Sequence, residues 1–320
     1  MPHTQVTSNA AAQLKRDDMP SANALSQTNA TAQPRTSAAD ALTVRPLNAA
    51  EEAEVLRFLA VRPLHTVCLV GLIRDNGVES PLNRGTFYGC RNEGGELVGV
   101  ALIGHATLFE TRTDDALTAF AQVAQTCRHT HMLLGEQEKV ERFWADYAQG
   151  GQPARLACRE LLFEQRLPVA VREAVAGLRL ATQADLDLVA PVQAELAFAE
   201  SGVNPLTRDP EGFRRRCARR IEQGRVWVWV EAGRLIFKTD IISETEDVTY
   251  LEGIWVNPQD RGHGLALRCM AQLGRTLLQK TKALSILVNE QNAAARHLYR
   301  RAGFKLRGCY DTIFLQQGDN

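Results

Sequence analysis

Apolar positions along the second half of the chain recur with the periods of alternating strands and helices. Runs rich in β-branched and aromatic residues predict strands at 177–181, 225–231, 234–242, 247–257, 284–289 and 308–316. Apolar spacings near 3.6 residues predict helices at 183–199, 210–222, 264–280 and 292–301, with a loop over 200–209. Such alternation is typical of an α/β or α+β protein in which helices cover a sheet.

The first half of the chain repeats the beginning of this pattern. Three pairs of similar segments occur in the same order, at separations of 136 to 139 residues. The pairs are 42–45 with 178–181, 85–88 with 224–227, and 95–98 with 233–236. This regularity predicts an internal duplication, with chance similarity between two unrelated α/β domains as the alternative.

Composition divides the chain further. Residues 1–40 are mostly Ala, Ser, Thr, Asn and Gln, which bury too little apolar surface to offset ordering, so we expect a disordered tail. Gly150 and Gly151 predict a flexible break. We therefore expect one lobe over 41–150, a linker or connecting strand over 151–170, and a second domain over 171–320.

Charge and cysteine content limit the partners and the compartment. The 37 basic residues balance 37 acidic ones, which argues against nucleic-acid or membrane-surface binding. We expect neither a membrane span nor a secretory signal. Seven widely spaced cysteines without a CxxC pair are typical of a reduced, cytoplasmic protein. His129 and His131 lack further ligands at metal-site spacing, so we expect no metal.

The segment 251–266 carries the most informative chemistry. An apolar strand runs into a turn in which Gly262 and Gly264 flank His263, and a helix follows. Glycines let a ligand approach the backbone, and the helix start offers free N–H groups, which suits a phosphate or pyrophosphate. Arg261 and His263 add positive charge. Taken alone, the turn equally fits an ordinary strand–turn–helix corner.

A second segment follows at a suitable distance. Asn292 is a fitting N-cap, Gly303 a fitting helix stop, and Asn292, Ala295 and Tyr299 share one helix face. Together, Gln259 to Gly264 and the Asn–Tyr–Gly–Phe series ending at Phe304 match the two motifs of the GNAT superfamily of N-acetyltransferases.

Over residues 177–316 the sequence therefore resembles the GNAT superfamily. More narrowly, it resembles bacterial tandem GNAT proteins with a degenerate N-terminal lobe. The implied fold is α/β (α+β), with two tandem GNAT-like lobes, each a mixed, mostly antiparallel sheet flanked by helices.

The resemblance implies that acetyl-CoA is the co-substrate. Its pantetheine arm would pair with the strand backbone at Ile254–Val256, and its pyrophosphate would rest on the turn and helix start. The implied cofactor-binding residues are Ile254, Trp255, Val256, Gln259, Arg261, Gly262, His263, Gly264, Leu265, Ala266, Asn289, Asn292 and Ala295.

Two residues are candidates for proton transfer. Tyr299 is the candidate acid for the departing thiolate; the alternative is an aromatic of the helix–sheet core. Glu252 is the candidate base, because strand alternation would place it on one face with Ile254 and Val256. The alternative is a strand-end carboxylate paired with a basic side chain.

The loop after the first helix of the second domain is the presumed acceptor region. There, Glu195, Glu200 and Asn204 are candidate substrate-binding residues, and either glutamate is an alternative base. The first lobe lacks the chemistry, because residues 109–115 replace the glycine turn, Glu138 replaces Asn292 and Ala145 replaces Tyr299. We expect no CoA binding there.

The implied function is transfer of an acetyl group to a primary amine of a small molecule or peptide, by direct attack on the thioester. The alternatives are a non-catalytic acyl-CoA sensor or scaffold and a transferase of a different acyl group. The sequence is compatible with a monomer or a homodimer.

Overall fold

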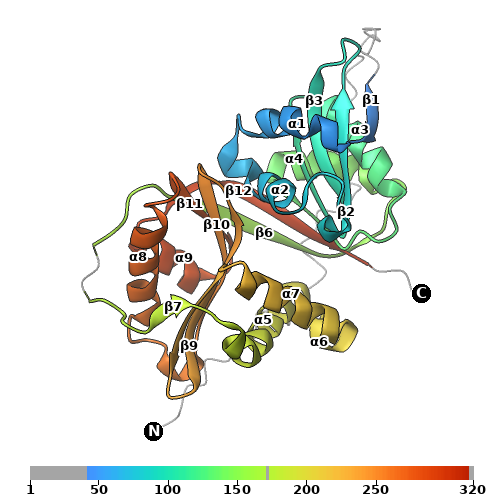
Figure 1. The fold of residues 1–320 in the computed structure, drawn as a ribbon. Helices are drawn as coiled ribbons and strands as arrows, with labels where there is room; N and C mark the ends of the chain where they lie inside the picture. The colour runs from blue at the N-terminus through green and yellow to red at the C-terminus, as the bar shows by residue number, and fades with distance from the viewer. Residues whose placement is uncertain (1–41, 171–172, 317–320) are drawn as a thin grey trace, which may run out of the picture.

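The computed structural model describes residues 42–170, the first half, and 173–316, the second half (Figure 1). The expected tail over 1–40 lies outside the described residues. The first half contains β1 (Thr43–Pro46), α1 (Glu52–Leu59), α2 (Pro63–Asn76), β2 (Gly85–Arg91), β3 (Leu97–Gly104), β4 (Ala106–Thr111), α3 (Asp114–Gln125), β5 (Met132–Glu136), α4 (Gln137–Tyr147) and β6 (Ala154–Gln165).

The second half follows the predicted elements closely. It contains β7 (Leu178–Leu180), α5 (Leu186–Ser201), α6 (Pro205–Arg208), α7 (Pro210–Glu222), β8 (Val226–Glu231), β9 (Arg234–Glu244), β10 (Val248–Val256), α8 (Leu265–Leu277), β11 (Ala283–Asn289), α9 (Ala293–Arg301) and β12 (Lys305–Leu315). The predicted loop over 200–209 was wrong in part, because Asn204 caps the short helix α6 and Pro205 begins it.

The strands form one mixed sheet with the order β1-β2-β3-β4-β5-β12-β6-β11-β10-β9-β8-β7. The succession β4-α3-β5-α4-β6 in the first half recurs as β10-α8-β11-α9-β12 in the second. The predicted α/β fold with two similar, mostly antiparallel lobes flanked by helices is therefore confirmed.

The two halves exchange their last strands. β6 ends the first half but pairs with β11, and β12 ends the second half but pairs with β5. β6 and β12 also pair with each other, antiparallel, along most of their length (Figure 1). The segment 151–170, expected as a linker or connecting strand, thus supplies a central strand of the shared sheet.

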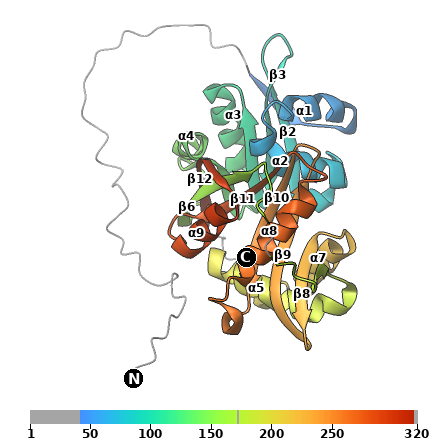
Figure 2. The same ribbon diagram turned by 90° about the vertical axis from the view of Figure 1, so that its left-hand side faces the viewer.

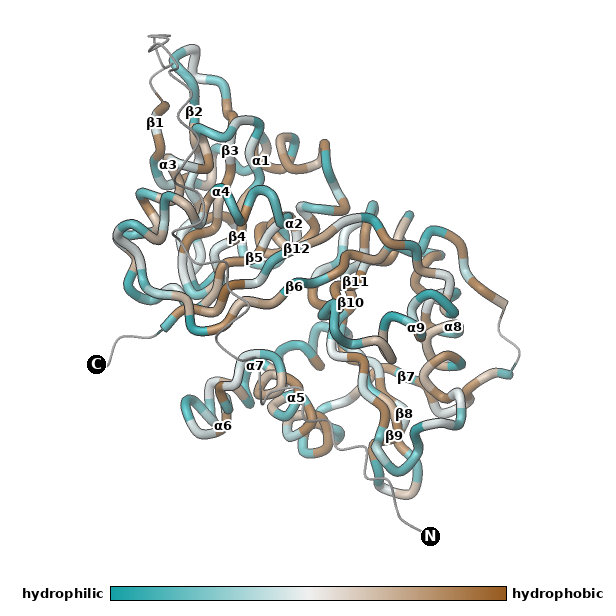
Figure 3. Tube along the Cα trace, turned by 180° about the vertical axis from the view of Figure 1, so that it is seen from behind, coloured by the Kyte–Doolittle hydropathy of each residue, from teal (hydrophilic) through white to brown (hydrophobic). Residues whose placement is uncertain are grey.

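Helices cover both faces of the sheet. Figures 1 and 2 show α3 and α4 on one side of β2 and β3, with α1 and α2 on the other. In the second half, α8 and α9 share an apolar core with one face, and α5 and α7 cover the opposite face. Viewed from behind, hydrophobic segments run through the middle of the sheet, as this layering requires (Figure 3).

Helix α2 of the first half also packs on strand β9 of the second half. Ser243 Oγ donates a 2.6 Å hydrogen bond to the Val67 carbonyl, and Arg225 forms an ion pair with Asp75. At Gly71, an added Cβ would lie 1.8 Å from Ser243 Oγ, so only glycine permits this approach. Helix α2 therefore lies at the boundary between the halves and packs against both.

Candidate active site

Strands β10 and β11 part in the middle of the second half. Their parallel pairing begins at Val248 with Ala283 and ends at Leu251 with Ile286. Immediately beyond, β10 bulges against β9, with Gly253 at a φ of 64°. A bulge of this kind bends the strand and changes the direction of the side chains that follow. The edge of β10 from Glu252 onwards is consequently unpaired on the side of β11.

The bulge corrects one prediction about Glu252. Leu251, Ile254 and Val256 pack in the same core as α8, whereas Trp255 packs in the core beneath α5. Because Glu252 follows Leu251 directly, its side chain takes the opposite face of the strand. The predicted shared face of Glu252, Ile254 and Val256 was wrong, since the bulge at Gly253 resets the alternation.

The predicted phosphate-binding turn has the required backbone. Gly262 and Gly264 have φ angles of 85° and 73°, and a Cβ on either would meet open space. Helix α8 begins at Leu265, and its N-cap, Gly264, contributes no side-chain cap. The first N–H groups of the helix, at Leu265 and Ala266, are thus available to an anion. The turn fits a pyrophosphate group.

Side chains around this turn hold it in place through hydrogen bonds and an ion pair. Arg234 of β9 donates to Gln259 Oε1 at 2.8 Å and pairs with Asp260. Arg261 Nε donates to the Val256 carbonyl at 3.1 Å, which ties the turn to the end of β10. His263 is exposed. The role of Gln259, Arg261 and His263 as cofactor ligands remains a prediction.

The turn after β11 is shaped by two asparagines. Asn289 Oδ1 accepts a hydrogen bond from the Gln291 amide at 2.9 Å, and Asn292 Oδ1 caps α9 through the Ala295 amide at 3.0 Å. Ala295 packs against the core of α8 and α9. These contacts bring the start of α9 to the parting strands, where all three residues remain predicted cofactor ligands.

Tyr299 is buried on α9. Its ring lies near those of Phe163 and Phe304, with centroids 6.2 and 5.9 Å away. Burial, followed by the charges of Glu200 and Glu252, raises the pKa of the phenol above its ordinary value. Tyr299 is therefore protonated at neutral pH, as a proton donor must be, and it is also part of the aromatic core.

Three glutamates, Glu160, Glu200 and Glu252, form an acidic cluster on the α5 side of the sheet. Burial raises the pKa of Glu252 and of Glu160. The side chain of Glu200 is exposed, yet desolvation by the surrounding protein, followed by the charges of Glu252 and Glu160, raises its pKa to about 8. Carboxylates that raise one another's pKa values favour the arrival of a cation or retain a proton.

Glu160 was not foreseen, because β6 was expected to be a connecting segment. Its side chain accepts a hydrogen bond from Thr312 of β12. The apolar run Leu161–Phe163, which directly follows Glu160, was the available signal for a buried strand here. The exchange of strands then brings this carboxylate of the first half to the acceptor side of the second.

A buried charge network underlies the cluster and was also missed. Lys238 is fully buried; its Nζ lies 2.8 Å from Asp240 Oδ1 and donates to Gln193 Oε1 at 2.6 Å. Arg220 donates to Asp240 Oδ2 at 3.0 Å. The charges of Arg220 and Lys238 oppose the effect of burial on the pKa of Glu252. The sequence signal for this network was the occurrence of Lys238 and Asp240 two positions apart in a strand rich in apolar residues.

The other acceptor-region candidates lie nearer the surface. Glu195 is exposed on α5, and Asn204 Oδ1 accepts from the Leu206 amide at 2.9 Å as the cap of α6. Both remain predictions as substrate-binding residues.

In the first half, ion pairs link β4 and β5, the strands that correspond to β10 and β11. Strands β4 and β5 pair only at Ala106 with Met132 and at Thr107 with Leu133. Beyond this point, Arg62 bridges Glu110 of β4 at 3.1 Å and Glu136 of β5 at 2.7 Å. No glycine turn follows β4; Thr113 instead caps α3 directly. These features support the prediction that this half binds no CoA.

Among residues 42–170 and 173–316, no group of three or more His, Cys, Asp or Glu could hold a metal ion. In the same residues, no helix combines the length and apolar character that crossing a membrane demands.

Comparison with known proteins gives a partial family match and a fold. Residues 240–313, from β9 to β12, match the family model described as FR47-like protein. No curated protein matches the chain. Solved structures similar over most of the chain include GNAT proteins, one of them a tandem GNAT protein. Residues 240–313 thus match one family model, and the chain as a whole has the fold of these GNAT structures.

Three solved structures illustrate the similarity. A GNAT-family acetyltransferase from Colwellia psychrerythraea is 15% identical, with a TM-score of 0.54 over 86% of this chain and 100% of the other. A tandem GNAT protein from the clavulanic acid biosynthesis pathway is 15% identical, with a TM-score of 0.54 over 88% and 100%. A Drosophila protein is 15% identical, with a TM-score of 0.61 over 86% and 99%. At this identity, the similarity establishes the fold.

Proposed function

We propose that the protein transfers an acetyl group from acetyl-CoA to a primary amine, with the second half as the catalytic half. One observation carries this proposal: β10 and β11 part at Glu252. This residue belongs to the acidic cluster, and its strand leads into the glycine turn and the uncapped start of α8. The turn suits the diphosphate of a nucleotide thioester, and the carboxylates suit an ammonium ion.

The donor would lie between the parted strands. Its pyrophosphate would accept hydrogen bonds from the N–H groups at the start of α8, near Gly264 and Leu265. Its pantetheine arm would pair with the free edge of β10 near Ile254. The Val256 carbonyl already accepts a hydrogen bond from Arg261, so Ile254 offers the less encumbered backbone partner.

The chemistry needs two proton transfers. Glu252, directly or through water, removes a proton from the ammonium, and the amine nitrogen then attacks the thioester carbonyl. The new C–N bond forms as the C–S bond breaks, and Tyr299 donates its proton to the departing thiolate. A thiol holds a proton with a pKa of about 8.5, so the thiol group of the released CoA stays protonated at pH 7.

The test is an assay of thiol release from acetyl-CoA with amines, amino acids, peptides and polyamines, in which accepted acetyl groups are read by mass. We expect amine-dependent release and a mass increase of one acetyl group. Binding of acetyl-CoA without turnover on any acceptor would instead indicate a sensor or scaffold. Release only with another acyl-CoA would change the donor.

A further inference from the structure

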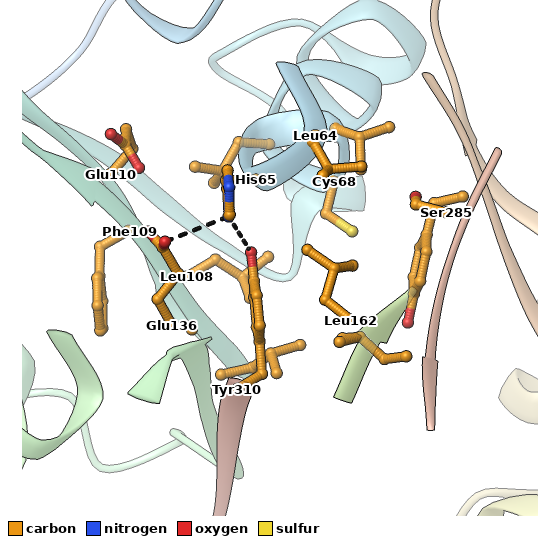
Figure 4. Close-up of a pocket in the computed structure, with 16 residues that line it drawn as sticks. Leu64, His65, Cys68, Leu108, Phe109, Glu110, Glu136, Leu162, Ser285 and Tyr310 are labelled. Carbon is orange, nitrogen blue, oxygen red and sulfur yellow. Dashed lines mark hydrogen bonds and ion pairs between the residues drawn. The ribbon is translucent and has the colours of Figure 1, made fainter. Parts of the chain in front are cut away.

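A cavity lies under α2, between this helix and the middle of the sheet (Figure 4). Its volume is about 50 Å³, enough for a few non-hydrogen atoms. Leu64 and Cys68 come from α2, and Leu162 and Ser285 come from the sheet. The lining is mostly apolar, and residues of both halves contribute to it.

The cavity begins beside the acidic cluster. Tyr250 lines it two positions before Glu252 on β10, and Leu162 lines it two positions after Glu160 on β6. Side chains two positions apart on a strand share a face and lie about 7 Å apart. A molecule held by these carboxylates can therefore extend along the sheet into the cavity.

One polar group in the cavity has no partner. The hydroxyl of Ser285 is fully buried and makes no hydrogen bond with any residue that the structure describes. A buried hydroxyl left without a hydrogen bond destabilises the folded protein, because it has lost its bonds to water. A ligand that supplies a hydrogen-bonding group at this point offsets that loss.

The ionisable groups of the cavity are either neutral or already paired. Burial raises the pKa of the Cys68 thiol to about 12 and raises the pKa values of Tyr250 and Tyr310 above their ordinary values. At the far end, His65 lies 2.9 Å from the Tyr310 hydroxyl and 3.3 Å from Glu136 (Figure 4).

The carboxylates at the far end are also satisfied. Arg62 binds both Glu110 and Glu136, and Lys139 lies 2.9 Å from Glu110 and 3.3 Å from Glu136. A charged group that entered the cavity would lose its hydration without gaining a free counter-ion, which is costly. The cavity therefore selects an uncharged group.

We propose that this cavity holds the far end of the acceptor, and that the acceptor is a primary amine ending in an uncharged hydrogen-bonding group such as a hydroxyl. This inference rests on the proposed function. Ser285 pairs with Tyr250, so it lies about 9 Å from Glu252, taking about 7 Å along the strand and about 5 Å across. Six single bonds, at about 1.2 Å each, span about 7 Å.

The length and the end group can be tested together. Four primary amines with similar chains differ at the far end: 5-amino-1-pentanol (hydroxyl), pentylamine (methyl), 1,5-diaminopentane (cation) and 5-aminopentanoate (anion). With acetyl-CoA, we expect the highest kcat/KM for the amino alcohol, about fivefold to tenfold above pentylamine, with the charged amines lowest. A higher kcat/KM for either charged amine would overturn the proposal.

Removal of the hydroxyl provides the matched test. In Ser285→Ala, we expect the amino alcohol to lose its advantage over pentylamine. Thr249→Val is the control, because Thr249 also carries a buried hydroxyl without a partner but does not line the cavity. If both variants, or neither, abolish the advantage, the assignment to Ser285 is wrong.

A binding measurement separates this inference from the proposed function. Absence of thiol release with every amine contradicts the proposed function alone. Calorimetry of the CoA-saturated protein should then still show about fivefold tighter binding of 5-amino-1-pentanol than of pentylamine, with the difference lost in Ser285→Ala. Equal affinities in the unaltered protein, or no heat with either amine, overturn the inference.

Discussion

At the scale of single residues, the proposed reaction depends on where protons reside. Tyr299 is held protonated by burial and by nearby carboxylates, and Glu252 is kept from easy ionisation by burial. Both shifts favour the protonated form before the substrate arrives, so the substrate itself must give the two groups their opposite roles. A cationic amine beside Glu252 would then favour ionisation of the carboxyl.

Replacement of Tyr299 by Phe removes the proton donor and keeps the ring. We expect kcat to fall about 100-fold or more, with the affinity for acetyl-CoA unchanged, in steady-state kinetics and calorimetry. Tyr88→Phe is the control, because Tyr88 packs in the core of the first half. Unchanged turnover in Tyr299→Phe would leave Tyr299 as a core aromatic only.

The pH profile identifies the base. Because a base must be ionised and burial raises the pKa of Glu252, kcat/KM should rise with pH through this raised value. In Glu252→Gln, we expect a fall of about 100-fold and the loss of this limb of the profile. If the limb persists there but disappears in Glu200→Gln, with a midpoint near pH 8, Glu200 is the base instead.

At the scale of elements, the glycine turn makes the start of α8 accessible. Its two positive φ angles were predictable from the residue types, as were the surrounding strand and helix. The bulge at Gly253 was not, because an inserted residue is defined by pairing with β9 and leaves no periodic trace. The orientation of Glu252 therefore required the structure.

Gly264→Ala should weaken CoA binding through the backbone. An L-residue at a φ of 73° costs about 1–2 kcal/mol, so the turn of the variant should relax in the free protein. CoA binding must then restore the strained turn, and we expect a Kd for CoA about tenfold higher by calorimetry. Gly233→Ala is a close control: this residue of the β8–β9 turn has the same φ and also open space around it, so it should leave the affinity for CoA unchanged.

At the scale of the whole molecule, one sheet and one helix join the two halves. The duplication was visible in the sequence, but the exchange of β6 and β12 was not, because local patterns do not specify which strands become neighbours. The acidic cluster and the cavity both depend on that exchange, which explains why Glu160 and Ser285 escaped sequence reasoning.

The contact between α2 and β9 should be intolerant of bulk. In Gly71→Val, the new side chain would overlap Ser243, so we expect the free energy of unfolding to fall by about 1–3 kcal/mol in urea titrations. Gly308→Val, at a strand position with open space, should change it by less than about 0.5 kcal/mol. Equal effects would show that the close approach at Gly71 is not needed.

The position of β12 has a consequence for synthesis on the ribosome. Domains generally fold from the N-terminus as they emerge, but β5 and β6 cannot acquire the strand between them until residues 305–315 have been translated. The first half must therefore remain incompletely paired until residue 315 has left the ribosome. Released chains that stop before residue 305 should be readily cleaved by proteases, and chains that include residue 315 should be protected.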